Sequence, residues 1–463
     1  MENERTFDET FDEVLSALLA LIQQKKYKEA RDLLLTGHNG ADVAELMEGI
    51  VDEEGIERAI ILFRMLPKDL SVEVFAYMPI DDQVNIINGI TDKEVRFIMD
   101  EMDFDDMIDV MEELPANLVD KILEKTPKEE RKLINTFLNY PDDCAGSIMT
   151  PDYISLRRDM TVAEALSYIK KVGMDSETVY TCYVKDTGRK LIGIISLRTL
   201  VVSENDLLVG DLMHDDYIFV NVYDDQEEVS EVFKKYDFLA IPVVDKEQRL
   251  VGIITVDDIL DVIEEEATED FERMAGILDD SDRKYLDMSV FHHAKSRLPW
   301  LIFLMISSMI TGVIITQFEA VLSKVIVLVS YLPMLMGTGG NTGSQAATLI
   351  IRGMTVGDLE PSDAAKVLWK EFRISMLIGV VLGSINFAKI VLIDGERVLI
   401  ALTVCLSMLL IVAFAKMIGG LVPMVAKRIG IDPALMANPM ISSVTDMISV
   451  LTYFLLATML LGL

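Results

Sequence analysis

One carboxylate, that of Asp446, lies inside a C-terminal segment that otherwise has the composition of a membrane helix, NPMISSVTDMISVLTYFLLATMLLGL. An ionised side chain there costs about 2.5 kcal/mol or more, so such residues usually serve an ion path or face a bundle interior. Pro439 would free backbone carbonyls one to two turns before Asp446. The alternative is a structural ion pair with Lys389 or Lys416, which also lie in apolar segments. Further oxygen atoms are offered nearby by Asn438, Ser442, Ser443 and Thr445.

A second polar segment interrupts an apolar run, PMLMGTGGNTGSQAAT, residues 333–348. Its glycines and Pro333 favour non-helical backbone, which is tolerated at membrane depth only where it lines water or is buried in protein. Freed carbonyls, Asn341 and Gln345 would then supply oxygen ligands. Two alternatives remain open at this point, an ordinary turn and a set of small residues that allows helices to pack closely.

The ligand chemistry of both segments is that of hard cations. No histidine follows His293 and Cys405 stands alone, so oxygen ligands favour Mg²⁺, Ca²⁺ or Mn²⁺ over Zn²⁺ or copper. One carboxylate per chain is too few for a closed cage, and Mg²⁺ suits a sparse site because it keeps its waters. If two chains met on a two-fold axis, two copies of Asp446 would line one pore.

Charge divides the chain into two halves. The 463 residues carry a net charge of −34, of which residues 1–297 contribute −35 and residues 298–463 contribute +1. An anionic surface repels phosphates, which makes nucleic acid an improbable partner and cations the natural one. The acidic start MENERTFDETFDE has no apolar core, so we expect no signal peptide and a cytoplasmic N-terminal half.

The residues indicate no enzyme. We find no nucleophile–base pair, phosphate-binding loop or metalloprotease signature. Three cysteines without paired or metal-type spacing predict no disulfide framework. The histidines are His38, His214, His292 and His293, and the cysteines are Cys144, Cys182 and Cys405.

Five apolar stretches approach the length of about 20 residues that spans a bilayer. Lysine and arginine residues gather before the first span, between the second and third spans, and between the fourth and fifth spans. Because basic loops lie on the cytoplasmic side, the N-terminus is predicted inside and the C-terminus outside. A cluster of buried helices in a soluble core is the alternative. The predicted spans are Leu298–Thr316, Ala320–Met336, Ile374–Ile393, Val398–Leu421 and Met440–Leu463.

The cytoplasmic half begins with a 12-residue repeat. Each unit starts with Pro, Thr or Asp, which suit a helix start, and has room for about two helical turns, so the units must stack to bury their apolar faces. We therefore predict a short α-solenoid. The repeated pairs are Leu66-Pro67, Met78-Pro79, Ile90-Thr91, Met102-Asp103, Leu114-Pro115 and Thr126-Pro127.

A longer duplication follows in residues 146–265. Met149 corresponds to Met213 and Gly193 to Gly252, and each copy has the pattern strand, helix, strand, turn, strand, helix. The second copy continues into an amphipathic helix, predicted over Val256–Asp280, whose start is crowded with acids. A divalent cation between the acidic domains would relieve their mutual repulsion, so one ion could be both cargo and signal.

Together these residues resemble the MgtE family of magnesium channels and transporters, over nearly the whole chain. The motifs that carry the resemblance are YPDDCAGSIMT, YDFLAIPVVD with GIITVDDILDV, EEEATED, GTGGNTGSQ and DPALMANP with SSVTD. The resemblance implies a multi-pass protein of the bacterial plasma (inner) membrane, a homodimer that closes its axial pore when intracellular Mg²⁺ binds. It implies a helical N domain (1–139), a tandem cystathionine-β-synthase (CBS) pair of α/β fold (140–262), a connecting plug helix (263–296) and an all-α five-helix transmembrane domain (297–463).

The resemblance also assigns candidate Mg²⁺ ligands. The pore acid would be Asp446, with Asn341 and Asn438 nearby. The sensor acids would be Glu73, Asp105 and Asp109 in the N domain, Asp225, Glu227, Asp237, Asp258 and Asp261 in the second CBS copy, and Glu266, Glu269 and Asp270 in the plug.

One departure puts ATP binding in doubt. CBS nucleotide sites commonly end in Ser/Thr-x-x-Asp, but the first copy has Thr199 at the aspartate position, and Asp258 of the second copy is also a candidate sensor acid. Two functional alternatives stay open, a coupled carrier that exchanges Mg²⁺ for Na⁺ or H⁺ and a non-conducting membrane-anchored sensor.

Overall fold

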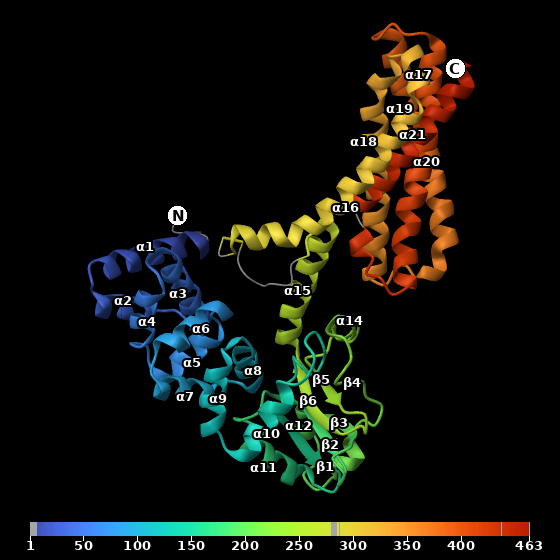
Figure 1. Ribbon diagram of the computed structural model, residues 1–463. Coiled ribbons are helices and arrows are strands. Elements are labelled where there is room, and N and C mark those ends of the chain that lie inside the picture. The colour runs from blue at the N-terminus through green and yellow to red at the C-terminus, as the bar shows by residue number, and fades with distance from the viewer. Residues whose placement is uncertain (1–6, 279–284, 287, 437, 463) are drawn as a thin grey trace, which may run out of the picture. The chain divides into compact units, whose positions relative to one another are not determined.

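The computed structural model describes residues 7–278, 285–286, 288–436 and 438–462, and the chain forms two compact units, residues 1–263 and 264–463. We describe each unit by itself. The predicted fold class is confirmed: a helical domain and two CBS domains with mixed sheets precede a helical C-terminal region (Figure 1).

The N-terminal unit begins with ten helices. Their regularity follows the repeat, because α5 to α10 begin directly after the residues that open each predicted unit, Pro67, Pro79, Thr91, Asp103, Pro115 and Pro127. The helices are α1 (Phe7–Gln23), α2 (Tyr27–Leu34), α3 (Gly40–Glu54), α4 (Ile56–Phe63), α5 (Lys68–Ala76), α6 (Ile80–Gly89), α7 (Asp92–Glu101), α8 (Phe104–Glu113), α9 (Ala116–Lys125) and α10 (Lys128–Phe137).

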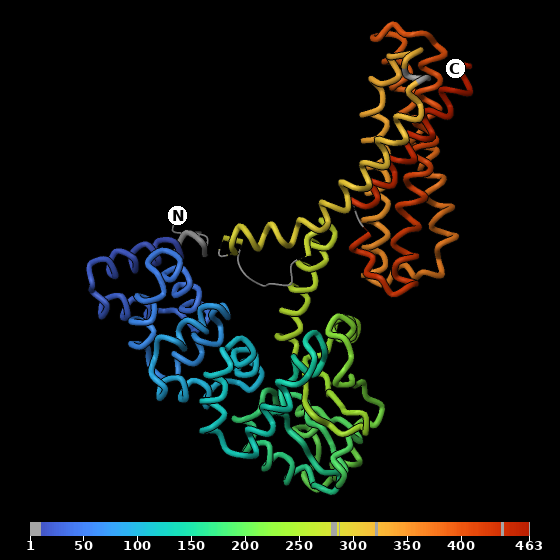
Figure 2. The backbone as a smooth tube through the Cα atoms, viewed as in Figure 1, coloured from blue at the N-terminus to red at the C-terminus, as the bar shows by residue number. Residues whose placement is uncertain are grey.

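Stacking of these helices buries their apolar faces. In Figure 2 the blue-to-cyan backbone forms successive short coils that lie side by side, as in a solenoid. Helix α5 packs on α3 and α7, and α6 packs on α4 and α8. The buried set includes Leu62, Val74, Phe75, Ile86 and Ile108, so the repeat forms one continuous core as predicted.

Each CBS copy contains a three-stranded mixed sheet. In both, the first strand pairs parallel with the second and the second pairs antiparallel with the third. The first copy contains β1 (Tyr153–Arg157), α11 (Val162–Val172), β2 (Thr178–Lys185), β3 (Leu191–Ser196) and α12 (Leu197–Val202), followed by α13 (Val209–Leu212). The second contains β4 (Val220–Asn221), α14 (Gln226–Tyr236), β5 (Ala240–Val244), β6 (Leu250–Thr255) and α15 (Val256–Ala275).

The two copies exchange their leading segments. Met149, which precedes the first copy, lies against Gly252 of the second, where an added Cβ would be 2.7 Å from the methionine sulfur. Met213, which precedes the second copy, lies against Gly193 of the first, with a corresponding distance of 2.8 Å. The matching methionines and glycines of the duplication are therefore reciprocal contacts that join the copies.

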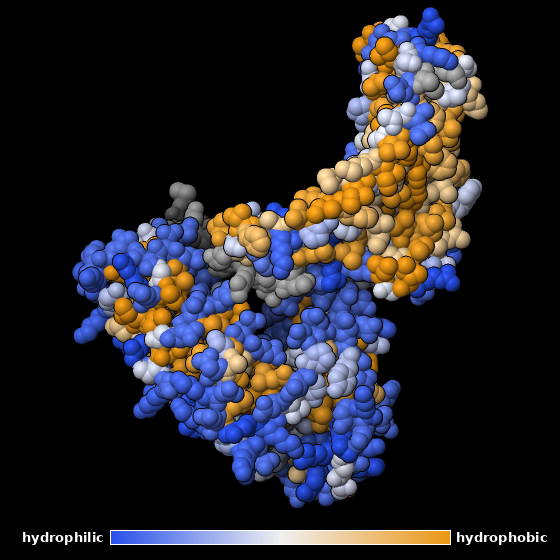
Figure 3. Space-filling view, in the orientation of Figure 1, coloured by the Kyte–Doolittle hydropathy of each residue, from blue (hydrophilic) through white to orange (hydrophobic). Residues whose placement is uncertain are grey.

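The C-terminal unit is a helical bundle whose helices pack α18 against α20 and α21, and α19 against α20. Four described helical stretches are long and apolar enough to cross a membrane: Val290–Gln317, Pro361–Leu392, Val398–Arg428 and Ala434–Leu461. Figure 3 shows apolar side chains gathered over this unit and hydrophilic ones over the CBS copies. The helices are α16 (Val290–Gln317), α17 (Glu319–Lys324), α18 (Leu328–Thr355), α19 (Ala364–Leu392), α20 (Val398–Arg428) and α21 (Asn438–Leu461), with short 3₁₀ turns η1 (Pro361–Asp363) and η2 (Ala434–Met436).

The prediction for the second span was wrong in its position. The expected span Ala320–Met336 is broken between α17 and α18, and the long helix instead runs from Leu328 to Thr355. The predicted amphipathic helix also ends earlier, at Ala275, because Gly276 adopts a φ of +74° that ends the helix. Asp280, its predicted end, lies outside the described residues.

Candidate ion path and metal centre

Helix α21 carries the candidate pore acid. It begins at Asn438, so Pro439 lies in the first turn, where a proline removes no helical hydrogen bond. The expectation that Pro439 frees carbonyls near Asp446 is therefore wrong. Asp446 lies two turns further along, half-buried in the single chain.

The glycine-rich segment is helical, which corrects the expectation of non-helical backbone. All of GTGGNTGSQ belongs to α18. A Cβ on Gly343 would be 3.2 Å from the Ala415 carbonyl oxygen, and one on Gly419 would be 2.1 Å from the Gly343 carbonyl oxygen. The glycines thus allow α18 and α20 to approach closely, which is the alternative of small residues at a helix contact.

Helix α18 presents a polar stripe on the face that its own chain leaves uncovered. Asn341 and Gln345 are exposed, one helical turn apart, while the neighbouring Gly339, Gly340 and Gly343 are buried against α20 and α21. At the same four-residue spacing the other exposed positions are Pro333, Gly337 and the apolar Leu349, so Asn341 and Gln345 form the polar part of this stripe. In lipid, unpaired amide side chains would cost free energy, so this face requires water or protein.

Helices α18 and α21 are in contact beside the two candidate ligands in the sequence. Ser344 and Ser442 approach at 3.5 Å between their hydroxyl oxygens. A Cβ on Gly340 would be 3.2 Å from the Ser442 hydroxyl oxygen. Asn341 follows Gly340 directly, and Asp446 lies one turn after Ser442, so both flank this contact. The side chain of Asn438 lies outside what the structure describes.

Both lysines that were alternative partners for Asp446 are paired elsewhere. Lys416 donates to Glu371 at 3.4 Å, and both residues are buried, with 4% and 6% of their surface exposed. Lys389 donates to Asp394 at 2.6 Å. The structural ion pair considered for Asp446 is therefore not made by either residue.

We expect Lys416→Met to destabilise the bundle strongly. It leaves the Glu371 carboxylate buried without its cation, a change that costs about 3–5 kcal/mol where a buried pair is broken. The double variant Lys416→Met/Glu371→Leu should recover most of the loss. Thermal unfolding in detergent measures both, with Lys366→Met as the control, because Lys366 pairs with Asp363 at an exposed site. Equal unfolding temperatures of the three variants would contradict the expectation.

A cluster of carboxylates forms in the N-terminal unit, where α8 and the start of α15 lie within electrostatic range. Loss of hydration raises the pKa of Asp105 to about 7, that of Asp109 to about 8 and that of Asp258 to about 7. Mutual repulsion adds to each shift, since Asp105 repels both Asp109 and Asp258. No lysine or arginine in the described part of the chain forms an ion pair with these three acids.

Two members of this cluster were missed in the sequence. Burial raises the pKa of Asp106 to about 7, with repulsion from Asp258 and Asp261 among the causes. Burial likewise raises the pKa of Glu177 to about 8, with repulsion from Asp105. Asp106 lies between the predicted Asp105 and Asp109 in the acidic sequence DFDDMID, residues 103–109, and could have been found there. Glu177 precedes β2 in a loop of the first CBS copy, and only the fold brings it to α8.

The other predicted sensor acids lie elsewhere. Glu73 is exposed on α5, over Gly40. Asp225 caps α14 by accepting the Glu227 backbone N–H at 2.9 Å, and Asp237 ends that helix in the left-handed conformation. Glu266, Glu269 and Asp270 belong to the C-terminal unit. Among the described residues, no group of three or more His, Cys, Asp or Glu converges closely enough to hold a metal ion.

The raised pKa values predict how the stability of the Mg²⁺-free protein depends on pH. A carboxyl group whose folded-state pKa is about 7 or 8, above its ordinary value of 3.8, binds its proton more tightly in the folded state. The stability contributed by Asp105, Asp109 and Asp258 is therefore full below about pH 4 and is lost progressively as the pH rises from there through about 7 to 8. We expect the unfolding temperature of the N-terminal unit in chelator to fall across that range. A flat or rising profile would contradict it.

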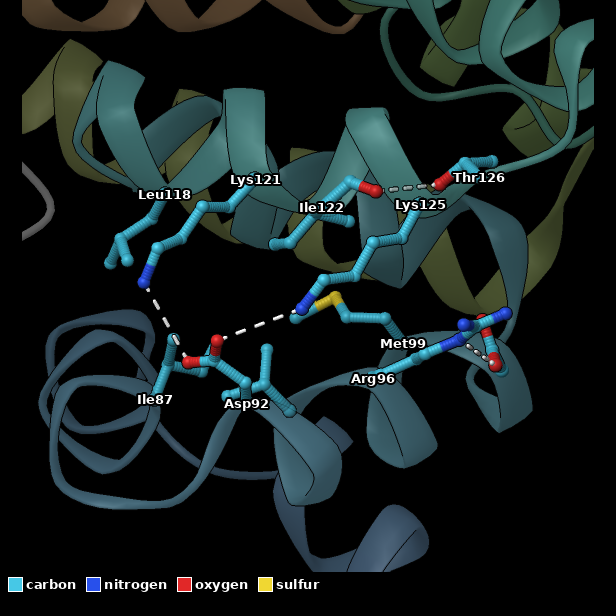
Figure 4. A pocket seen from close by; sticks show the side chains of 11 residues that line it. Ile87, Asp92, Arg96, Met99, Leu118, Lys121, Ile122, Lys125 and Thr126 are labelled. Atoms are coloured by element: carbon cyan, nitrogen blue, oxygen red, sulfur yellow. Dashed lines mark hydrogen bonds and ion pairs between the residues drawn. The ribbon is translucent and has the colours of Figure 1, made fainter.

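A groove between α7 and α9 is separate from the candidate ion sites. Its floor is apolar, with Met99, Leu118 and Ile122, and Asp92 lies between Lys121 and Lys125 at 3.7 and 3.6 Å (Figure 4). Arg96 pairs with Asp100 on the same rim. None of the candidate Mg²⁺ ligands lines it, and its charged side chains are already paired, so this groove is not the metal centre.

Membrane-length helices that follow a helical domain and two CBS copies define a multidomain membrane protein, and its class is that of a divalent cation transporter. Family models agree: residues 332–456 match a divalent cation transporter domain (MgtE), residues 39–143 match the MgtE intracellular N domain, and residues 145–204 and 209–265 match CBS domains. The chain is 36% identical to the magnesium transporter MgtE of Thermus thermophilus over 89% of this chain and 91% of that protein. It is 31% identical to the magnesium transporter MgtE of Bacillus subtilis over 97% and 98% of the two chains.

The chain belongs to the MgtE family. It is a homologue of the magnesium transporter MgtE, a multi-pass membrane protein with an intracellular N domain, and not an enzyme. Among solved structures, the cytosolic domain of the Mg²⁺ channel MgtE in complex with ATP is 32% identical and covers 54% of this chain and 99% of that one, with a TM-score of 0.49.

Proposed function

We propose that this chain forms a Mg²⁺ channel of the plasma membrane that closes when Mg²⁺ binds its cytoplasmic acids. The observation that supports conduction is the polar stripe of α18, where Asn341 and Gln345 are exposed, together with the half-buried Asp446 on the adjacent helix α21. A stripe of this kind within a membrane-spanning bundle is stable where it lines water. The proposal counts α18 as a membrane span in addition to the four membrane-length helices, which gives five spans. The N-terminus is then cytoplasmic and the C-terminus outside.

A second copy of the chain would complete the pore. In a single chain the stripe faces outward, and only a partner surface or water can satisfy it. A two-fold axis along this face would bring two Asp446 carboxylates and two Asn341 amides to one path, with Asn438 near its cytoplasmic end. Two carboxylates that act through retained water suit Mg²⁺, which gives up its hydration shell reluctantly.

Closure would be driven by the acid cluster of the N-terminal unit. Mg²⁺ shifts a two-state equilibrium only if it binds one state more tightly. Carboxylates that repel one another while they lose hydration supply such a difference, because a bridging dication stabilises only the compact arrangement. Asp105, Asp109, Asp258 and Asp261 are the principal sensor acids in this proposal, joined by Asp106 and Glu177. The remaining candidates are Glu73, Asp225, Glu227, Asp237, Glu266, Glu269 and Asp270.

ATP is a weaker expectation for this chain. A structure of a relative's cytosolic domain holds ATP, but here Thr199 replaces the aspartate of the first site and its hydroxyl lies 2.8 Å from that of Ser196. Asp258 of the second site accepts the Thr255 hydroxyl at 2.6 Å and belongs to the acid cluster. Any nucleotide at the second site would therefore compete with the sensor role of Asp258.

Flux measurements separate a channel from the two alternatives. The chain is reconstituted in liposomes with a Mg²⁺-sensitive dye, and an inward Mg²⁺ gradient is imposed with and without opposing Na⁺ and H⁺ gradients. Uptake that follows the Mg²⁺ gradient alone supports a channel. Uptake that requires a Na⁺ or H⁺ gradient would support the coupled carrier, and no uptake with a Mg²⁺-free cytoplasmic face would support the non-conducting sensor.

A further inference from the structure

The last turn of α15 is bonded to the segment that leads into α21. The Arg273 guanidinium donates to the Asp432 carboxylate at 2.8 Å and also pairs with Glu269, one turn earlier on α15. Asp432 lies in the loop between α20 and η2, and both partners are partly buried, with 38% and 25% of their side chains exposed. All of these residues belong to the C-terminal unit.

Asp432 also binds the backbone that leads into helix α21. Its second carboxylate oxygen accepts the backbone N–H of Ala434 at 2.7 Å, and Ala434 is buried at the start of η2. Helix α21, with Asp446, begins directly after this turn. One side chain therefore joins the end of α15 to the backbone at the entrance of α21.

Apolar contacts fix the same turn. Met274 packs against Ala347 and Ile351 of α18 and Ile441 of α21. Beyond it, Gly276 lies so close to Trp300 of α16 that an added Cβ would be 2.0 Å from the indole ring. The Leu278 backbone N–H donates to the Ser296 carbonyl at 3.1 Å. The end of α15 is thus held by three helices of the bundle.

The two ends of α15 differ in the origin of their counter-charge. At the start, Asp258 forms no ion pair with a described lysine or arginine, and the neighbouring Asp105 and Asp257 repel its carboxylate. At the end, Arg273 provides a covalently attached cation for Glu269 and Asp432. Arg352 of α18 lies within electrostatic range of Asp270 in the same region. In the proposed function, a dissociable Mg²⁺ ion would serve the acidic start of this helix, whereas the permanent cation of Arg273 serves its end.

We propose that Arg273 is a positioning residue that holds the last turn of α15 on the pore entrance whether or not Mg²⁺ is bound, so that this turn is the pivot of the helix. The inference rests on the proposed function, because it assigns Mg²⁺ to the acidic start of α15 and the transmission of that signal to the Arg273–Asp432 bond. Glu269, one of the predicted sensor acids, then serves Arg273 rather than Mg²⁺.

Cross-linking tests the pivot without reference to conduction. Met274→Cys and Ile441→Cys are introduced after Cys144, Cys182 and Cys405 are replaced by alanine. We expect the pair to form a disulfide at the same rate in Mg²⁺ and in chelator, because this turn stays in place. A rate that falls severalfold in chelator would mean that the turn leaves the bundle, which overturns the proposal.

Recordings of single channels test the transmission. Arg273→Gln and Asp432→Asn should each raise the cytoplasmic Mg²⁺ concentration that half-closes the channel by about three- to tenfold, and should leave the unitary conductance unchanged. The charge exchange Arg273→Asp/Asp432→Arg should restore part of the shift, which a merely structural role would not predict. Arg428→Gln, an exposed base at the end of α20, is the matched control.

Two results distinguish a failure of the proposed gating from a failure of the role of Arg273. Wild-type current that ignores cytoplasmic Mg²⁺ would refute the proposed gating before any variant is made. Wild-type gating together with unshifted closing curves for Arg273→Gln and Asp432→Asn would refute the role of Arg273 and leave the proposed function intact.

Discussion

Asp446→Ala should reduce Mg²⁺ uptake into liposomes to the level of empty vesicles. Lys389 and Lys416 are paired with Asp394 and Glu371 and do not neutralise Asp446, so the charge of Asp446 is available to a hydrated ion. A hydrogen bond between a carboxylate and an ion-bound water contributes about 1.5–3 kcal/mol, and 1.4 kcal/mol corresponds to a factor of ten. We therefore expect at least about a tenfold loss, with a similar loss for Asp446→Asn and a partial one for Asp446→Glu.

The control for this experiment is Asp358→Ala, which removes an exposed carboxylate from the loop after α18. It should transport Mg²⁺ like the wild type. All variants must also elute as a single folded species before their uptake is compared. Equal uptake by Asp446→Ala and the wild type would make Asp446 a structural residue. Asn341, on the exposed stripe of α18, would then be the next residue to test.

Removing three charges from the acid cluster should abolish the Mg²⁺-dependent gain in stability of the N-terminal unit. In Asp105→Asn/Asp109→Asn/Asp258→Asn, each amide keeps the shape of the carboxyl group and removes its charge. Without Mg²⁺ the variant should unfold at a higher temperature than the wild type, because lost hydration and mutual repulsion raise the pKa of all three acids. A gain of 1 kcal/mol corresponds to about 2–4 °C in a unit of this size.

Addition of Mg²⁺ distinguishes the variant from the wild type. A ligand that binds only the folded state stabilises it in proportion to the logarithm of its concentration, so the wild type should gain several degrees. The triple variant should gain little. The matched control, Asp211→Asn/Asp215→Asn/Asp216→Asn, removes the same charge from exposed positions and should respond like the wild type. An undiminished Mg²⁺ response in the cluster variant would refute the sensor assignment.

The secondary structure of the cytoplasmic half could be predicted because its signals are local in the sequence. The repeated Pro, Thr and Asp residues stand directly before helices α5 to α10, so the 12-residue period predicts where these helices begin. Among them, Thr91 caps its helix by accepting the Glu94 backbone N–H. The duplication predicted two equivalent sheets for the same reason. It could not predict that Met149 crosses to Gly252, because that contact depends on how the copies associate.

The features that were predicted wrongly or missed depend on tertiary contacts. Four glycines indicate non-helical backbone by local propensity, yet Gly343 and Gly419 are helical because α18 and α20 need to approach closely. Glu177 joins the acid cluster, and Glu371 pairs with Lys416, across distances that no local pattern encodes. The exposed stripe of α18 is visible only once the helix is placed against α20 and α21.

The central claim is that Mg²⁺ both passes through this protein and closes it from the cytoplasmic side. Its most direct test is the current through inside-out membrane patches, with Mg²⁺ fixed on the outer face and stepped on the cytoplasmic face from chelator into the millimolar range. The account predicts a Mg²⁺ current in chelator that disappears reversibly as cytoplasmic Mg²⁺ rises. A current that persists unchanged at millimolar Mg²⁺, or no current in chelator, would contradict it.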